Sequence, residues 1–169
     1  MANDNPVQVL DERTGATIVT VGRPLVFVRQ LSAASADVPC YVTLAAASID
    51  QSGTIKNVFL AYFWCAGPVP RTEISPGQQP IVLTAESGTV TLSPDSLTLL
   101  EEGISDPPHR PPFGRPAAYV YPATLQTMRD LGDSGHLALI SVAQQYELFE
   151  DRREALRRFV RSLSKAGQD

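Results

Sequence analysis

The chain is poor in the residues from which catalytic and metal sites are most often built. Its 169 residues include only two histidines, His109 and His136, and two cysteines, Cys40 and Cys65. Neither histidine has a cysteine, a second histidine or a carboxylate at the spacing typical of a metal site, so we expect no metal and no cofactor. The sequence also lacks a Gly-x-Ser-x-Gly elbow and a glycine-rich phosphate loop, which leaves no motif for a serine hydrolase or a nucleotide-binding enzyme.

Long apolar segments and a basic surface are missing as well. Because no run of about 18 apolar residues occurs, we expect no membrane-spanning segment, and the first residues lack the basic and apolar regions of a signal peptide. The net charge of −4 gives no reason to expect nucleic acid as a partner, since such binding depends on a basic surface. The length suits one domain over residues 1–169, with residues 1–6 and 166–169 disordered.

A mirror symmetry around Gln51-Ser52-Gly53-Thr54 is the strongest local signal. If this turn closes a hairpin with Asp50 opposite Ile55, facing residue numbers sum to 105 and Cys40 lies opposite Cys65. Directly opposed residues on antiparallel strands are close enough for a disulfide. Two alternatives stay open. A three-residue loop would place Cys40 opposite Trp64, or the cysteines are reduced and serve as small buried apolar residues.

The same register makes both faces of this hairpin apolar or aromatic. The second face carries Tyr41 opposite Trp64 and Thr43 opposite Tyr62. Strands with water on one side usually alternate between apolar and polar residues, so the second face needs a cover. We expect the C-terminal helix, the proline-rich loop or a partner protein to supply it. If Tyr41, Tyr62 and Trp64 were instead exposed, they would form a platform for a small apolar ligand or a glycan.

The rest of the chain predicts a mainly β, antiparallel, sandwich-like domain with two helices. Runs of β-branched and apolar residues between turn signals predict strands at 7–11, 16–20, 25–29, 40–49, 55–65, 80–84, 89–92, 118–121, 136–142 and 146–149. A short helix is predicted near 123–131, starting from Pro122, and an amphipathic helix near 151–164, capped by Asp151 and Glu154. Residues 104–116 contain five prolines and predict a crossover loop.

Two groups of charged residues are weaker functional signals. A carboxylate pair for acid/base hydrolysis would come from Asp95, Glu101, Glu102 and Asp106, and a solvated acidic loop is the plainer interpretation. The C-terminal helix carries a basic face that includes Arg153, Arg157, Arg158 and Arg161. This face would contact anionic lipid headgroups or an acidic partner, or it remains solvated beside an acidic β region.

Several short segments resemble a group of uncharacterised bacterial exported or lipoprotein-like proteins of similar size. The resemblance rests on Leu10-Asp11-Glu12-Arg13-Thr14-Gly15-Ala16-Thr17 followed by Pro24-Leu25-Val26-Phe27, on Tyr121 to Leu131 and Leu137-Ala138-Leu139, and on the closing residues 153–160. These are turn and core patterns, and the group has no assigned activity. The resemblance implies a location in the periplasm or cell envelope. The cytoplasm remains the alternative, because this sequence shows no export leader and no lipidated cysteine.

Together these observations predict a non-enzymatic, envelope-associated structural or protein-interaction domain. A protein partner and a peripheral or lipid-anchored association with a membrane both stay open. The first alternative is a binding module for a small apolar ligand or a glycan that uses the aromatic residues of the sheet. The second is a hydrolase that uses the loop carboxylates.

Overall fold

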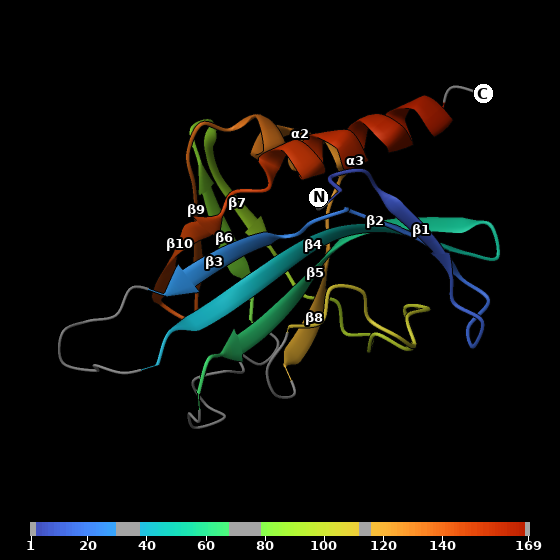
Figure 1. The fold of residues 1–169 in the computed structure, drawn as a ribbon, viewed down its shortest axis with the longest axis horizontal. Helices are drawn as coiled ribbons and strands as arrows, with labels where there is room; N and C mark the ends of the chain where they lie inside the picture. Colours follow the sequence, from blue (N-terminus) through green and yellow to red (C-terminus); the bar gives the residue numbers. More distant parts are fainter. Residues whose placement is uncertain (1–2, 30–37, 68–78, 112–115, 168–169) are drawn as a thin grey trace.

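A computed structural model of the chain describes residues 3–29, 38–67, 79–111 and 116–167. Within these ranges the protein is mainly β, with ten antiparallel strands in one sheet and two helices, one of them C-terminal (Figure 1). The strands are β1 (Val7–Leu10), β2 (Thr17–Thr20), β3 (Leu25–Arg29), β4 (Cys40–Gln51), β5 (Thr54–Cys65), β6 (Ile81–Ala85), β7 (Gly88–Leu92), β8 (Ala117–Pro122), β9 (Leu137–Ser141) and β10 (Gln144–Glu150). The helices are α2 (Leu125–Asp133) and α3 (Arg153–Ala166), and the predicted fold class is confirmed.

The long hairpin β4–β5 has the predicted register. Asp50 faces Ile55 and Cys40 faces Cys65, so facing residue numbers sum to 105 along the whole hairpin, and the three-residue loop is wrong. The turn is Ser52-Gly53, with φ of 55° and 86°. Positive φ at both central residues is the backbone that matches the twist of a two-residue hairpin. A disulfide joins Cys40 to Cys65, so the interpretation as reduced cysteines is also wrong.

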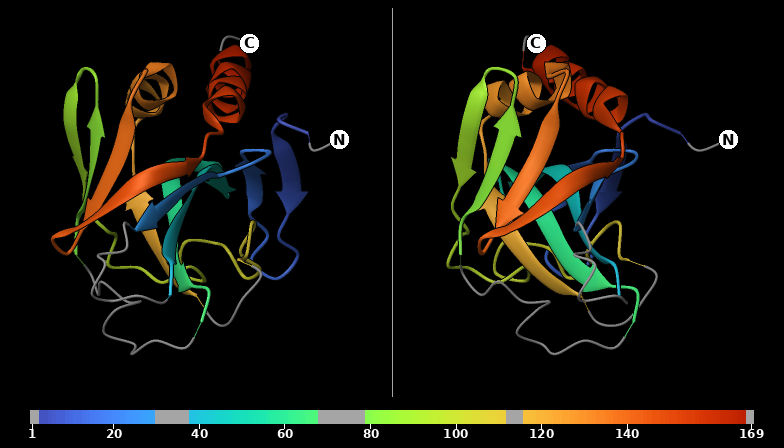
Figure 2. Two further views of the ribbon diagram at one scale, coloured as in Figure 1. Left: turned by 60° about the vertical axis from the view of Figure 1, so that its left-hand side comes forward. Right: turned by 90° about the vertical axis from the view of Figure 1, so that its left-hand side faces the viewer.

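The sheet branches at β4, which places this hairpin at its centre. Along the edge of β4 opposite β5, residues 47–50 pair with β2 and residues 41–44 pair with β3. The first branch ends in β1, and the second continues through β10, β9, β6 and β7. On the other side, β8 pairs with β5. The two branches curve away from the shared hairpin, so that β6–β7 and β1 lie at opposite sides of the molecule (Figure 2).

Helices α2 and α3 pack against each other beside the curved sheet (Figure 2). Gly132 permits their close approach, because a Cβ at this position would lie 3.2 Å from the Arg157 side chain. The helices bury apolar residues, namely Met128, Leu131, Ala155, Leu156, Phe159 and Val160. These join the core formed by the hairpin and its neighbours, so the helices close one side of the sheet.

Both helices begin later than the sequence pattern predicts. Pro122 ends β8, opposite Val58, and Thr124 caps α2 by accepting a hydrogen bond from the Thr127 N–H. Helix α3 begins at Arg153, whose N–H donates to Asp151. The predicted capping pair does not form, because the Glu154 carboxylate is held by arginines of its own helix.

The described parts of the proline-rich segment, 104–111 and 116, contain neither helix nor strand. Asp4 and Asn5, in the terminus for which disorder is predicted, accept hydrogen bonds from Arg23 and Arg158. Residues 31–37, whose small side chains predict a loop, lie outside the described residues. None of the described helices has the length and apolar character needed to cross a membrane.

Candidate functional site

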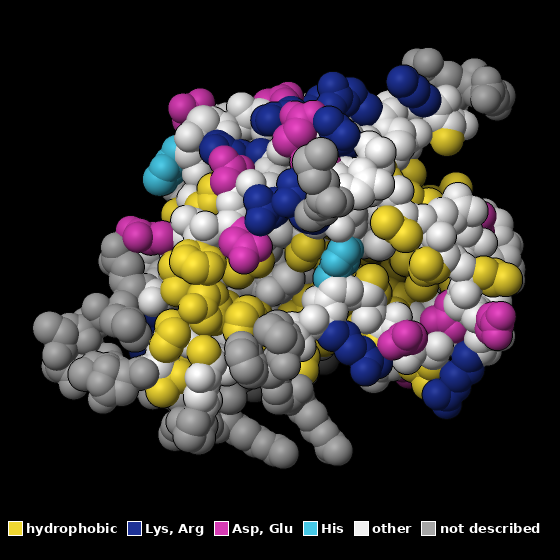
Figure 3. Space-filling view, in the orientation of Figure 1, with side chains coloured by type: hydrophobic (Ala, Val, Ile, Leu, Met, Phe, Trp, Pro, Cys, Tyr) yellow, Lys and Arg dark blue, Asp and Glu magenta, His cyan; other side chains and the backbone are white. Residues whose placement is uncertain are grey.

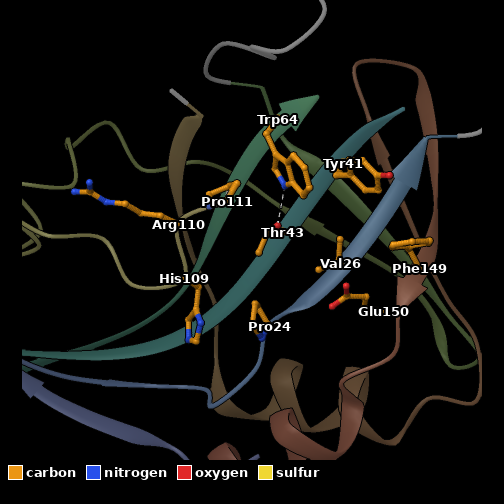
Figure 4. Close-up of a pocket in the computed structure, with 10 residues that line it drawn as sticks. All are labelled: Pro24, Val26, Tyr41, Thr43, Trp64, His109, Arg110, Pro111, Phe149 and Glu150. Carbon is orange, nitrogen blue, oxygen red and sulfur yellow. Dashed lines mark hydrogen bonds between the residues drawn. The ribbon is translucent and has the colours of Figure 1, made fainter. Parts of the chain in front are cut away.

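An open cavity of about 330 Å³ lies at the disulfide end of the β4–β5 hairpin (Figure 4). Strands β3, β4, β5 and β10 form one part of its wall, and the proline-rich segment forms the other. The lining residues are Pro24, Val26, Tyr41, Thr43, Trp64, His109, Arg110, Pro111, Phe149 and Glu150. Apolar side chains also gather on the surface over the ends of β3 and β10 (Figure 3).

The hairpin register positions the aromatic wall of this cavity. Tyr41 and Trp64 face each other across β4 and β5, and their rings stack with centroids 4.4 Å apart and planes 19° apart. The indole Nε1–H donates to the Thr43 hydroxyl at 2.9 Å. The Cys40–Cys65 disulfide is the next pair along the hairpin. The orientation of Trp64 is therefore fixed by a ring contact, a hydrogen bond and a nearby covalent link.

Phe149 joins this pair because β10 contains a bulge. Leu148 pairs with Phe27 and Glu150 pairs with Val26, which leaves Phe149 as the extra residue. A bulge redirects the side chain of the inserted residue, and Phe149 contacts Tyr41 at a centroid distance of 5.6 Å. The Phe149 side chain is 57% exposed. No sequence motif predicts a site at Phe149, although the adjacent apolar residues Leu148 and Phe149 break the alternation of the strand.

His109 closes the cavity from the proline-rich side. The sequence favours an exposed side chain here, but His109 is half-buried and its Nε2 lies 2.7 Å from the Val21 carbonyl oxygen. A carbonyl only accepts, so Nε2 carries the proton. Burial lowers the pKa of His109, which keeps the imidazole neutral at pH 7 and leaves Nδ1 as an acceptor. Its φ of 60° is a conformation that residues with a Cβ rarely adopt.

Tyr62 lies on the same face of β5 but not in this cavity. It is 1% exposed, and its hydroxyl donates to the Pro108 carbonyl. Burial raises the pKa of this phenol. The proline-rich segment therefore covers this part of the hairpin, which is one of the three covers that the sequence left open. Of the three aromatic residues proposed for a platform, the structure brings Tyr41 and Trp64 together and places Tyr62 under the segment.

Two of the four loop carboxylates, Asp95 and Glu102, meet at the opposite, turn end of the hairpin. Lys56 forms ion pairs with Asp95 and with Glu102, the second at 2.8 Å. The hydrogen bond from Lys56 lowers the pKa of Asp95, whereas burial raises the pKa of Glu102. Glu101 instead accepts from the Thr98 N–H. Asp106 pairs with Arg110.

The arginines of α3 are largely engaged with their own surroundings. Arg157, Arg158 and Arg161 converge on the Glu154 carboxylate. Arg153 pairs with Asp151 and also donates to the Ser134 carbonyl. Basic and acidic side chains accordingly intermingle over this part of the surface (Figure 3). The helix face nevertheless keeps an excess of positive charge, because three guanidinium groups share one carboxylate.

Within the described ranges, no three histidine, cysteine or acidic side chains lie close enough to hold a metal ion together. Comparison with protein-family models, with curated proteins and with solved structures finds no match for the chain.

Proposed function

We propose that the protein is a non-enzymatic binding domain that holds a sugar ring, as part of a glycan, in the cavity at the disulfide end of the hairpin. The observation that carries the proposal is the aromatic cluster of Tyr41, Trp64 and Phe149 at the wall of an open cavity. Ligand sites are typically concave and mostly apolar, with a few placed polar groups. This cavity has both properties.

The polar groups of the cavity favour a sugar over a purely apolar ligand. His109 Nδ1 is an acceptor, and the Glu150 carboxylate, which is about half exposed and lies 3.6 Å from Arg152, accepts as well. An apolar ligand would bury His109 Nδ1 without a donor, which costs free energy. A sugar ring presents hydroxyl donors together with an apolar C–H face. It therefore matches both the acceptors and the aromatic wall.

The disulfide supports a location in the cell envelope. Disulfides persist in oxidising compartments and are rare in a reducing cytoplasm. This agrees with the exported proteins that the sequence resembles. In such a setting, the ligand that we propose is a glycan of the envelope. Binding to this glycan would anchor the domain, and a structural or protein-interaction role would follow from the anchoring.

The carboxylates of the turn end support a binding role over hydrolysis. General acid/base hydrolysis needs two carboxyl groups placed on either side of the scissile bond. Here a single ammonium group, that of Lys56, binds both Asp95 and Glu102. The arrangement ties the loop to the hairpin, which is a structural use of the charges.

Fluorescence of Trp64, the single tryptophan of the chain, tests the proposal. Glucose, N-acetylglucosamine and cellobiose are titrated separately, with iodide quenching measured before and after each titration. We expect at least one saccharide to change the emission and to reduce quenching. Binding of an apolar probe such as 1-naphthol, without any saccharide response, would support the apolar-ligand alternative. A Trp64 that iodide does not quench and no probe affects would overturn the proposal.

A further inference from the structure

Strand β1 is an edge of the sheet with an exposed apolar surface. All four of its residues are exposed, including Val7 at 45%, Val9 at 43% and Leu10 at 64%. It pairs with β2 on one side, and among the described strands none pairs with its other side. Figure 2 shows β1 at the outer limit of the molecule, next to the first described residues.

The hydrogen-bond phase of β1 shows which backbone groups face outward. The Asp11 N–H donates to the Ala16 carbonyl at 2.8 Å, so Asp11 and Ala16 are a hydrogen-bonded pair. Every second pair along the strands is of the same kind, so Val9 with Ile18 and Val7 with Thr20 are also hydrogen-bonded pairs. Antiparallel strands alternate between bonded and non-bonded pairs. Gln8 and Leu10 therefore direct their N–H and C=O groups away from β2, toward the open side.

Apart from its short length, strand β1 lacks the features by which proteins usually protect such an edge. Its sequence, Val-Gln-Val-Leu, contains no charge and no proline, and its pairing with β2 has no bulge. Charged residues, prolines and bulges are the common means of blocking edge pairing. By contrast, the exposed residues of edge strand β7 are mainly polar or glycine, as in Gly88, Thr89 and Thr91.

We propose that β1 pairs with β1 of a second copy of this chain, antiparallel and around a two-fold axis through Val9. In this register Gln8 of each copy faces Leu10 of the other, and these residues exchange both of their backbone hydrogen bonds. Val9 faces its own counterpart as a non-bonded pair, whose side chains approach closely. Both outward-facing residues of each strand are thereby satisfied.

The length and charge of the edge favour a second copy over an unrelated strand. Pro6, which has no N–H, precedes β1, and the turn after Asp11 ends it, so the open edge offers only Gln8 and Leu10 as complete bonding residues. An identical strand matches this length and brings no like charges together. A four-residue strand pair buries less than the roughly 1,200 Å² at the lower end of stable interfaces, so the dimer is weak and reversible.

Sedimentation velocity from micromolar to near-millimolar protein tests the dimer. We expect the wild-type sedimentation coefficient to rise with concentration, and Gln8→Pro to remove this rise. Proline is tolerated where the N–H faces outward from an edge strand, so this variant retains the native circular dichroism spectrum. Gln8→Ala, which keeps the N–H, still dimerises. A wild type that remains monomeric throughout, or a folded Gln8→Pro variant that dimerises like wild type, would overturn the proposal.

A charge exchange at Val9 tests the two-fold register itself. Val9→Lys and Val9→Glu each place like charges across the axis and abolish self-association at low salt. An equimolar mixture of the two variants restores the dimer as a mixed pair. If the wild type dimerises but the mixture does not, the proposed register is wrong.

Discussion

Lys56 and Trp64 lie on the same face of β5, at opposite ends of the hairpin. At the turn end, the Lys56 ammonium group is bound by Asp95 and by the buried Glu102. At the disulfide end, Trp64 and Tyr41 are half-buried and line an open cavity with the exposed Phe149. Internal partners occupy the charged groups of the first site, which makes it a structural site. The second presents aromatic and polar surface to a cavity, and it is here that we propose binding.

Removal of the disulfide is expected to have the largest effect on stability. The bond links residues separated by 25 positions, and the chain-entropy model gives about 3.5 kcal/mol for such a loop. Urea unfolding of the Cys40→Ala, Cys65→Ala double variant should show a loss of this size. Dithiothreitol should lower the stability of the wild type to that of the variant and leave the variant unchanged. A loss below about 1 kcal/mol would contradict the stabilising role given to the bond.

Lys56→Met should have the next largest effect, because it leaves Glu102 buried without its counter-charge. Breaking a buried pair typically costs about 3 to 5 kcal/mol, and since Lys56 is 34% exposed we expect about 2 kcal/mol. Lys165→Met, on an exposed position near the end of α3, is the matched control and should change stability by less than about 0.5 kcal/mol. Saccharide affinity should be the same in both variants. A loss of saccharide affinity in Lys56→Met alone would contradict the proposal that the turn end contributes stability and only the disulfide end binds saccharide.

Acidification should weaken the turn end through Asp11. Hydrogen bonds from the Ser105 N–H and hydroxyl hold the pKa of Asp11 well below its usual range. The stabilisation is therefore fully present above the pKa of an unfolded aspartate, about 4, and is lost as the pH falls through the lower folded value. The melting temperature of Asp11→Asn should lie below that of the wild type at neutral pH, and the gap should narrow in acid. A gap that does not depend on pH would show that Asp11 contributes no charge-dependent stability.

Phe149→Ala should have the smallest effect on stability and a clear effect on binding. The side chain is 57% exposed, so truncation should change the unfolding free energy by less than about 0.5 kcal/mol. Saccharide affinity should fall about tenfold, as expected when an aromatic wall loses a contact worth about 1.4 kcal/mol. Val142→Ala is the control, since Val142 is similarly exposed at 55% and does not line the cavity. Equal saccharide affinities of the two variants would show that Phe149 does not contribute to binding.

The sequence predicts those features that depend on neighbouring residues or on the register of a single hairpin. The turn at Ser52-Gly53 determines the pairing of Cys40 with Cys65 and of Tyr41 with Trp64, because a hairpin register follows from its turn. The helix starts were misplaced by local signals. Pro122 continues β8 opposite Val58, and that tertiary pairing prevails over its preference for a first helical turn.

The rest of the candidate site depends on contacts between distant residues. Phe149 reaches Tyr41 only because β10 bulges where it pairs with β3, and no short motif marks that bulge. His109 is half-buried because its ring bonds to Val21, far away in the sequence. Tyr62 has the same pattern position as Trp64, and only the path of the proline-rich segment separates their environments.

A saccharide titration followed by ¹H–¹⁵N NMR spectroscopy tests most directly whether binding is confined to the disulfide end of the hairpin. The single indole N–H, that of Trp64, reports on the disulfide end, and the Gly53 amide reports on the turn end of the same hairpin. If saccharide binds only at the disulfide end, the indole cross-peak shifts and saturates with added saccharide while the Gly53 cross-peak does not move. An indole cross-peak that stays in place with every saccharide, or one that moves only together with Gly53, would contradict binding confined to that end.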